Sequence, residues 1–128
     1  MSIERVTATP AALALIERLQ RQHGPVMFYQ SGGCCDNSAP NCLLPGELMI
    51  GPADIYLGSL GSAPFYMSRS QYEYWKHTQL IVDAIAAPLG SDNFSLEGPE
   101  GQAFLSRSRL FSDAESAQIE AEGELPRP

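Results

Sequence analysis

The N-terminal stretch of the chain carries a helical repeat of apolar and polar positions. Leu13, Ile16 and Leu19 recur at helix spacing, and arginine and glutamine occupy the opposite side. Thr9-Pro10 can begin a helix, because the threonine hydroxyl can accept from an orphan amide and proline fits the first helical position. Gly24-Pro25 ends the repeat. This pattern predicts a helix between these two signals, packed against a sheet.

The residues after this helix alternate as in a strand. Residues 26–30 would place Val26 and Phe28 on one side and Met27 and Tyr29 on the other. Further short apolar runs, bounded by glycine and proline turns, indicate more strands. These predicted strands cover residues 47–50, 54–57, 64–67, 78–85, 94–97 and 103–111.

Two Ser-x-x-Glu sequences, Ser70–Glu73 and Ser112–Glu115, match the capping box that begins many helices. They predict a short helix over residues 71–77 and a second, acidic helix after Ser112. Residues 34–45 contain two prolines and show no periodicity, so we expect a loop there. Residues 98–101 have the composition of a turn that joins the last two strands.

These elements predict an α+β protein. Consecutive strands with short connections favour antiparallel pairing, so we expect a mainly antiparallel β-sheet bent into a sandwich or half-barrel. The N-terminal helix and a short C-terminal helix would pack beside it. The chain has 128 residues and no shift in composition that would divide it. We therefore predict a single α+β domain over residues 1–120 and a flexible acidic tail over residues 121–128.

Composition and charge exclude several classes of protein. The formal net charge is −7, so a basic surface for nucleic acid or anionic lipid is not expected. No apolar run approaches the roughly 20 residues that span a bilayer, and residues 1–5 lack the apolar core of a secretory signal, so we expect a cytoplasmic protein. Glycine-rich phosphate loops and the Gly-x-Ser-x-Gly elbow are also absent from the sequence, so no nucleotide cofactor is expected.

A cysteine cluster is the clearest candidate for chemistry. Cys34, Cys35 and Cys42 lie within nine residues, and an odd number of cysteines argues against a disulfide framework. Thiolates suit zinc, copper(I) and iron, and three sulfurs need one more ligand or leave one open position. That ligand would be an imidazole or a carboxylate from His77, Asp36 or Glu47.

Thiol redox chemistry is the alternative for the same cysteines. Cys34 and Cys35 could form a strained vicinal disulfide, or either could pair with Cys42. A reactive thiol needs a lowered pKa, and Ser31-Gly32-Gly33 could supply a nest of amide groups that lowers it. The structural alternative is that the three side chains only fill a tight loop.

Three segments of the chain resemble a known family. They are Gln30–Cys42, with its Ser-Gly-Gly-Cys-Cys-Asp string, together with Glu73–Leu80 and Phe104–Phe111. They resemble a bacterial family known only as a domain of unknown function, numbered 779. Members of that family are often encoded beside aldehyde dehydrogenases. The resemblance covers most of the chain and implies a genomic context, with an aldehyde dehydrogenase as partner, but no mechanism.

Two arginines could bind substrate. Arg107 and Arg109 share one face of their predicted strand, and two guanidinium groups side by side can bind a carboxylate or a phosphate. The structural alternative is an ion pair across the predicted hairpin with Glu97 or Glu100, which suits so acidic a chain.

From these residues we expect a small cytoplasmic accessory protein of aldehyde or alcohol metabolism. The first hypothesis is a metal-thiolate site that holds zinc or iron, for metal binding or metal-assisted chemistry on a small carbonyl compound. The second is a thiol redox protein that maintains a partner aldehyde dehydrogenase. The third is a non-catalytic binding subunit that uses an aromatic face. The aromatic residues that could line a pocket or an interface are Tyr66, Tyr72, Tyr74 and Trp75. A homodimer would cover an exposed edge strand of the sheet.

Overall fold

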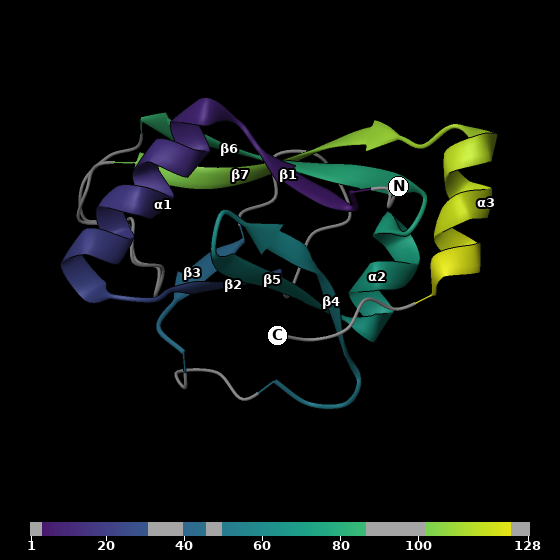
Figure 1. Cartoon of the computed structure of the whole chain (residues 1–128), viewed down its shortest axis with the longest axis horizontal. Coiled ribbons are helices and arrows are strands. Elements are labelled where there is room, and N and C mark those ends of the chain that lie inside the picture. Colours follow the sequence, from purple (N-terminus) through teal and green to yellow (C-terminus); the bar gives the residue numbers. More distant parts are fainter. Residues whose placement is uncertain (1–3, 31–39, 46–49, 87–101, 124–128) are drawn as a thin grey trace.

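The computed structural model describes residues 4–30, 40–45, 50–86 and 102–123, which contain three helices and seven strands (Figure 1). In chain order the elements are β1 (Val6–Ala8), α1 (Pro10–His23), β2 (Met27–Gln30), β3 (Asn41–Leu43), β4 (Asp54–Leu60), β5 (Ala63–Ser68), α2 (Arg69–Trp75), β6 (Thr78–Ala86), β7 (Gln102–Leu110) and α3 (Asp113–Glu122). The predicted α+β class, with a helix near each end, is confirmed. No helix in the described ranges is both long and apolar enough to cross a bilayer.

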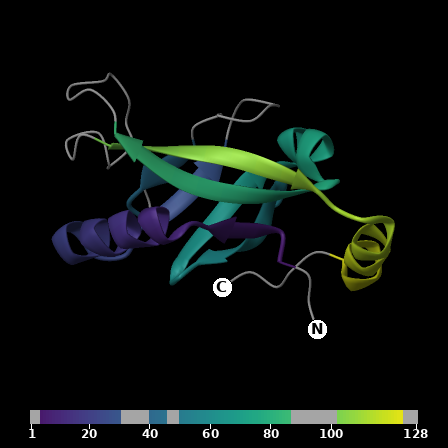
Figure 2. The ribbon, with the colours of Figure 1, turned by 90° about the horizontal axis from the view of Figure 1, so that it is seen from above.

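The strands form two sheets, and each sheet mixes parallel and antiparallel pairs. One sheet has the order β1-β6-β7 and the other the order β3-β2-β5-β4. The pairs β1–β6 and β2–β5 are parallel, and the remaining pairs are antiparallel. The sheets are therefore mainly antiparallel, as predicted, and within the described residues they do not close into a barrel. Figure 2 shows the long β6–β7 pair crossing over the strands of the other sheet.

The first helix begins and ends where the sequence predicts. The Thr9 side chain accepts a hydrogen bond from the Ala12 amide at 3.2 Å, and its hydroxyl donates to Asp83 of β6 at 2.8 Å. Gly24 ends the helix with a φ of 84°, which a residue with a side chain rarely adopts. Leu13 is 41% exposed, because the buried stripe of this helix runs through Leu15 instead.

The main core lies between the two sheets and α1. Val26 and Phe28 face this core, whereas Met27 packs with Leu43 and Tyr66 in a second cluster on the other face of the four-stranded sheet. The alternation predicted for residues 26–30 is therefore confirmed.

The structure corrects the prediction for the loop over residues 34–45, because residues 41–43 form β3. This short strand pairs with β2, and pairing with a strand of high β propensity overrides the local signal of the flanking prolines. The strand predicted over 94–97 and its turn lie outside the described residues, as do residues 47–49. Within the described residues, β7 pairs with β6 along its whole length.

The two predicted capping boxes differ in outcome. Ser112 and Glu115 form the complete box at the start of α3, which continues to Glu122, two residues into the predicted tail. In α2 the cap is Ser68, whose side chain accepts from the Gln71 amide. The prediction of Ser70 as the cap is wrong, because the helix begins directly at the end of β5.

The capping box of α3 also predicts a pH response. A pair of hydrogen bonds from Arg109, together with the Ser112 amide, lowers the pKa of Glu115 from 4.5 to about 2. A lowered carboxyl pKa contributes stability that is complete above pH 4.5 and is lost as the pH falls toward 2. An NMR titration should therefore find the Glu115 midpoint near 2, and Arg109→Gln should raise it.

Arg107→Gln is the matched control for this titration, because Arg107 lies two residues away on the same strand and contacts Asp83 instead. It should leave the Glu115 midpoint unchanged. An equal midpoint in Arg109→Gln and in the natural chain would show that the ion pair does not hold this proton.

Candidate functional site

Of the three cysteines in the predicted cluster, the structure describes Cys42, which lies on β3. We call β2, residues 31–39 and β3 the cysteine hairpin. Its two strands pair so that Cys42 lies opposite Phe28, and the Cys42 side chain is completely buried in the main core. Cys34, Cys35 and Asp36 belong to the same hairpin but lie outside the described residues, as does Glu47. The described residues therefore fix one of the three sulfurs, at the core side of the hairpin.

The base of the cysteine hairpin is firmly tied to the rest of the fold. Gln30, the last residue of β2, accepts a hydrogen bond from the Ser106 hydroxyl of the opposite sheet at 2.9 Å, and both side chains are buried. The Tyr29 hydroxyl donates to Asp54 at 2.6 Å, and burial, with help from this carboxylate, raises the pKa of Tyr29 to about 12. Segment 31–39 thus begins from a strand that is held on both faces.

His77 does not lie with Cys42. It follows α2, which packs against β4, β5 and β6, whereas β3 is the opposite edge strand from β4 (Figure 1). Its side chain is exposed. Within the described ranges, no three histidine, cysteine, aspartate or glutamate side chains come together as metal ligands.

The two predicted substrate arginines are engaged in ion pairs. Arg107 contacts Asp83 at 3.4 Å, and Arg109 makes two bonds to Glu115, at 3.1 and 3.0 Å. Both therefore have carboxylate partners, as the structural alternative expected, although these partners come from β6 and α3. The carboxylates named from the sequence, at positions 97 and 100, lie outside the described residues.

Tyr74 and Trp75 are two of the aromatic residues expected to line a pocket or an interface. They have opposite environments, although they are neighbours on α2. Tyr74 is 69% exposed, whereas Trp75 is 3% exposed and belongs to the main core. Trp75 therefore packs the fold, and Tyr74 is the aromatic side chain that a partner could contact.

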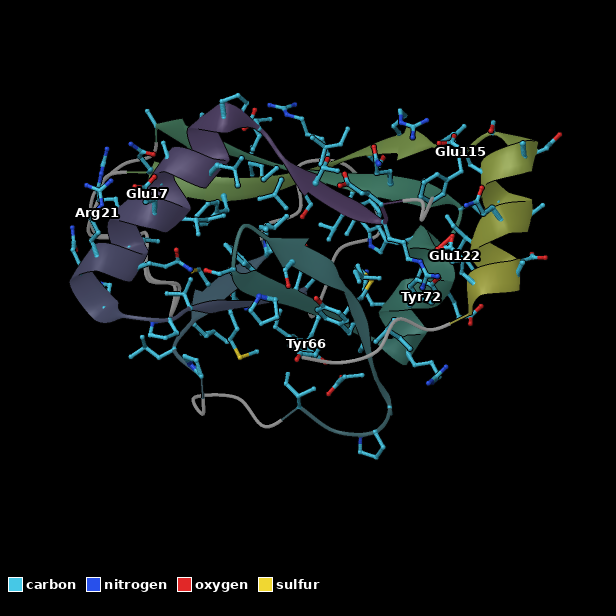
Figure 3. All side chains as sticks on the ribbon, viewed as in Figure 1. Glu17, Arg21, Tyr66, Tyr72, Glu115 and Glu122 are labelled. Atoms are coloured by element: carbon cyan, nitrogen blue, oxygen red, sulfur yellow. The ribbon has the colours of Figure 1, made fainter. Side chains whose placement is uncertain are left out.

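The structure also shows a cleft that the sequence analysis did not identify. We call it the α2–α3 cleft. It has a volume of about 330 Å³ and lies between the two helices. Figure 3 shows Tyr72 of α2 and Glu122 of α3 pointing toward the space between these helices. The residues that line the cleft are Arg5, Ile55, Arg69, Tyr72, Glu73, Lys76, His77, Ser116, Ile119, Glu120 and Gly123.

Arg5 is the unusual residue of the α2–α3 cleft. Its side chain is 4% exposed, and one terminal nitrogen donates to the carbonyl of Gly123. Its Nε has no hydrogen-bond partner among the described residues. A buried guanidinium normally has a carboxylate partner, because an unpaired charge is costly to remove from water. The sequence hints at this cleft through Tyr72, one of the aromatic residues expected to line a pocket, but it gives no signal for Arg5.

Comparison with known proteins finds one family. The model of the family described as Domain of unknown function (DUF779) matches residues 15–110. No curated protein and no solved structure matches the chain. The matched range includes the cysteine hairpin, α2 and β7, whereas Arg5 and α3 lie outside it.

Proposed function

The chain belongs to the family described as Domain of unknown function (DUF779), and we propose that its functional part is the cysteine hairpin, which holds a zinc or iron ion through thiolates. The proposal extends to a small cytoplasmic accessory protein in aldehyde or alcohol metabolism, with an aldehyde dehydrogenase as its partner. That setting depends on the genomic context associated with the family. The geometry of the described residues bears on the hairpin alone.

The observation that carries the proposal is the pairing of β3 with β2. It places Cys42 on the strand that pairs with β2, and the segment of the sequence that joins these two strands carries Cys34 and Cys35. Three thiolates are a suitable donor set for zinc or iron, which would hold the ligands together and leave a position for a fourth. Asp36 or Glu47 would supply that fourth ligand, since His77 lies near the other edge of the sheet.

The burial of Cys42 makes the proposal specific. A thiolate within an apolar core is stable only beside a cation, because the charge is otherwise removed from water without compensation. Cys42 therefore serves as a ligand only if the ion lies against the core side of the hairpin. Its sulfur would then be held in place by the same packing that fixes β3.

Substituting Cys42 tests this proposal. Cys42→Val keeps an apolar side chain of similar size in the core, so the variant should fold with little loss of stability. Elemental analysis of the natural chain, purified under reducing conditions, should find about one ion per chain, and Cys42→Val should hold less than about a tenth of that. Chelation should lower the melting temperature of the natural chain but not that of the variant.

A second variant, Cys34→Ser with Cys35→Ser, should lose the ion as well. The metal site is ruled out if the natural chain contains no ion. Cys42 is a packing residue, and not a ligand, if Cys42→Val retains the full metal content.

Thiol redox chemistry is the second candidate, and the burial of Cys42 restricts it. A sulfur that is completely buried cannot exchange with a thiol in solution without opening of the fold. A redox role therefore falls to Cys34 and Cys35. Alkylation of the folded protein, followed by mass analysis, should then modify these two cysteines and spare Cys42.

A further inference from the structure

We propose that the α2–α3 cleft binds the carboxylate group of a small organic acid, with Arg5 as the buried counter-charge at its floor. This site is separate from the cysteine hairpin, because it is lined by Arg5, which precedes β1, by Ile55 of β4 and by residues of α2 and α3, at the other edge of the four-stranded sheet.

The Arg5 guanidinium is buried with one of its donors unmet. The side chain is 4% exposed and donates one hydrogen bond to the Gly123 carbonyl. A neutral carbonyl accepts this bond but does not balance the charge, and Nε is buried without an acceptor in the described part of the chain. An anion in the cleft would bring a negative charge close to this guanidinium. Arginine is also the side chain whose planar fork best matches a carboxylate.

The charges at the rim limit the charge of the ligand. Arg69 and Lys76 bring positive charge to the cleft, and both already have partners; that of Lys76 is Glu73, at 2.8 Å. Glu120 adds a second carboxylate to the lining. These acidic groups repel a dianion, whereas a single negative charge can bind at the floor beside Arg5. This pattern favours a monocarboxylate over a phosphate.

The walls of the cleft suit the rest of such a molecule. Ile55, Ile119 and the Tyr72 ring offer apolar surface beside the charged floor. The volume of about 330 Å³ is at the small end of the range for ligand pockets. A short aliphatic or single-ring acid therefore fits better than a nucleotide or a peptide.

Benzoate and benzamide provide the test, because they share a ring and differ in charge. Isothermal titration calorimetry of the full chain should detect benzoate binding with a dissociation constant of about 1 mM or lower, and benzamide should bind at least about tenfold more weakly. Inorganic phosphate should also bind more weakly than benzoate. Absence of benzoate binding up to about 10 mM, or equal binding of benzamide or phosphate, would overturn the proposal.

Variants connect the binding to Arg5. Arg5→Met keeps the length of the side chain and removes its charge, so benzoate affinity should fall at least about tenfold. Its melting temperature should not fall, because a buried charge has been replaced by an apolar side chain of similar length. A purely structural arginine would give the opposite result, a lower melting temperature with benzoate affinity unchanged.

Three further variants complete the design. Arg69→Gln removes an exposed cation of the same cleft and should weaken benzoate binding several-fold. Unchanged affinity in this variant would contradict the proposal even if Arg5→Met failed to fold. Arg107→Gln, on the outer face of β7, should bind benzoate as the natural chain does. Cys42→Val should also retain benzoate binding, so failure of the metal site and failure of this site are distinguishable.

Discussion

Replacing Phe104 with alanine should lower the free energy of unfolding by about 3–5 kcal/mol. Phe104 of β7 is completely buried, and the edge of its ring meets the Phe28 ring with centroids 5.0 Å apart and planes at 86°. Phe28 in turn stacks on Phe65 at 5.9 Å. Three rings from three strands therefore join the two sheets, and Phe104 is the contribution of the β1-β6-β7 sheet.

Urea denaturation, followed by the fluorescence of the single tryptophan, Trp75, would measure the change. Small domains have a total stability of about 5–15 kcal/mol, so the variant should unfold at a much lower urea concentration. Leu110→Ala is the matched control, because Leu110 lies on the same strand and is 75% exposed. It should change the stability by less than about 0.5 kcal/mol. Similar losses in the two variants would show that the ring cluster does not hold the sheets together.

The elements that could be predicted from the sequence are those whose signals are local. The cap at Thr9 and the capping box at Ser112 act over three residues, so the pattern alone places the starts of α1 and α3. The alternation over 26–30 is also local. It assigns Val26 and Phe28 to the main core because successive side chains of any strand point to opposite faces.

The elements that were missed depend on contacts between distant residues. β1 has three residues, too few for a periodic signal, and is a strand because Val6 pairs with Leu80 in a parallel arrangement. β3 is equally short, and prolines on either side hide it. It forms because β2 offers an edge. Parallel pairing of β2 with β5 likewise has no local signature, since the turn that would reveal an antiparallel hairpin is absent from such a pair.

The same distinction applies to the candidate sites. The cysteine cluster is visible from residue type and spacing, but the position of His77 relative to Cys42 depends on the order of the strands, which the sequence pattern does not fix. Arg5 is a single charged residue before a short strand, and its hydrogen-bond partner, Gly123, is 118 residues away. Neither burial of the guanidinium nor its incomplete bonding could be inferred without the packing of α3 against the start of the chain.

The hydrogen bond between Ser106 and Gln30 should be the most important polar contact for the cysteine hairpin. Both side chains are buried between the sheets, and the bond joins β7 to the last residue of β2, directly before segment 31–39. Gln30→Leu should cost about 1–3 kcal/mol, because it leaves the Ser106 hydroxyl buried without this acceptor. Ser106→Ala should cost a similar amount, since it leaves the Gln30 carbonyl oxygen without this donor.

The double variant, Gln30→Leu with Ser106→Ala, separates the free energy of the hydrogen bond from the separate contributions of the two side chains. With both partners replaced by apolar groups, the loss should be smaller than the sum of the single losses by about 1 kcal/mol, as measured by urea denaturation. Additive losses would mean that the two groups contribute independently.

If the hairpin holds a metal ion, Gln30→Leu should also release that ion faster to a chelator than the natural chain does, because the base from which the cysteines extend is less firmly fixed. Equal release rates would separate the stability of the fold from the function proposed for the hairpin.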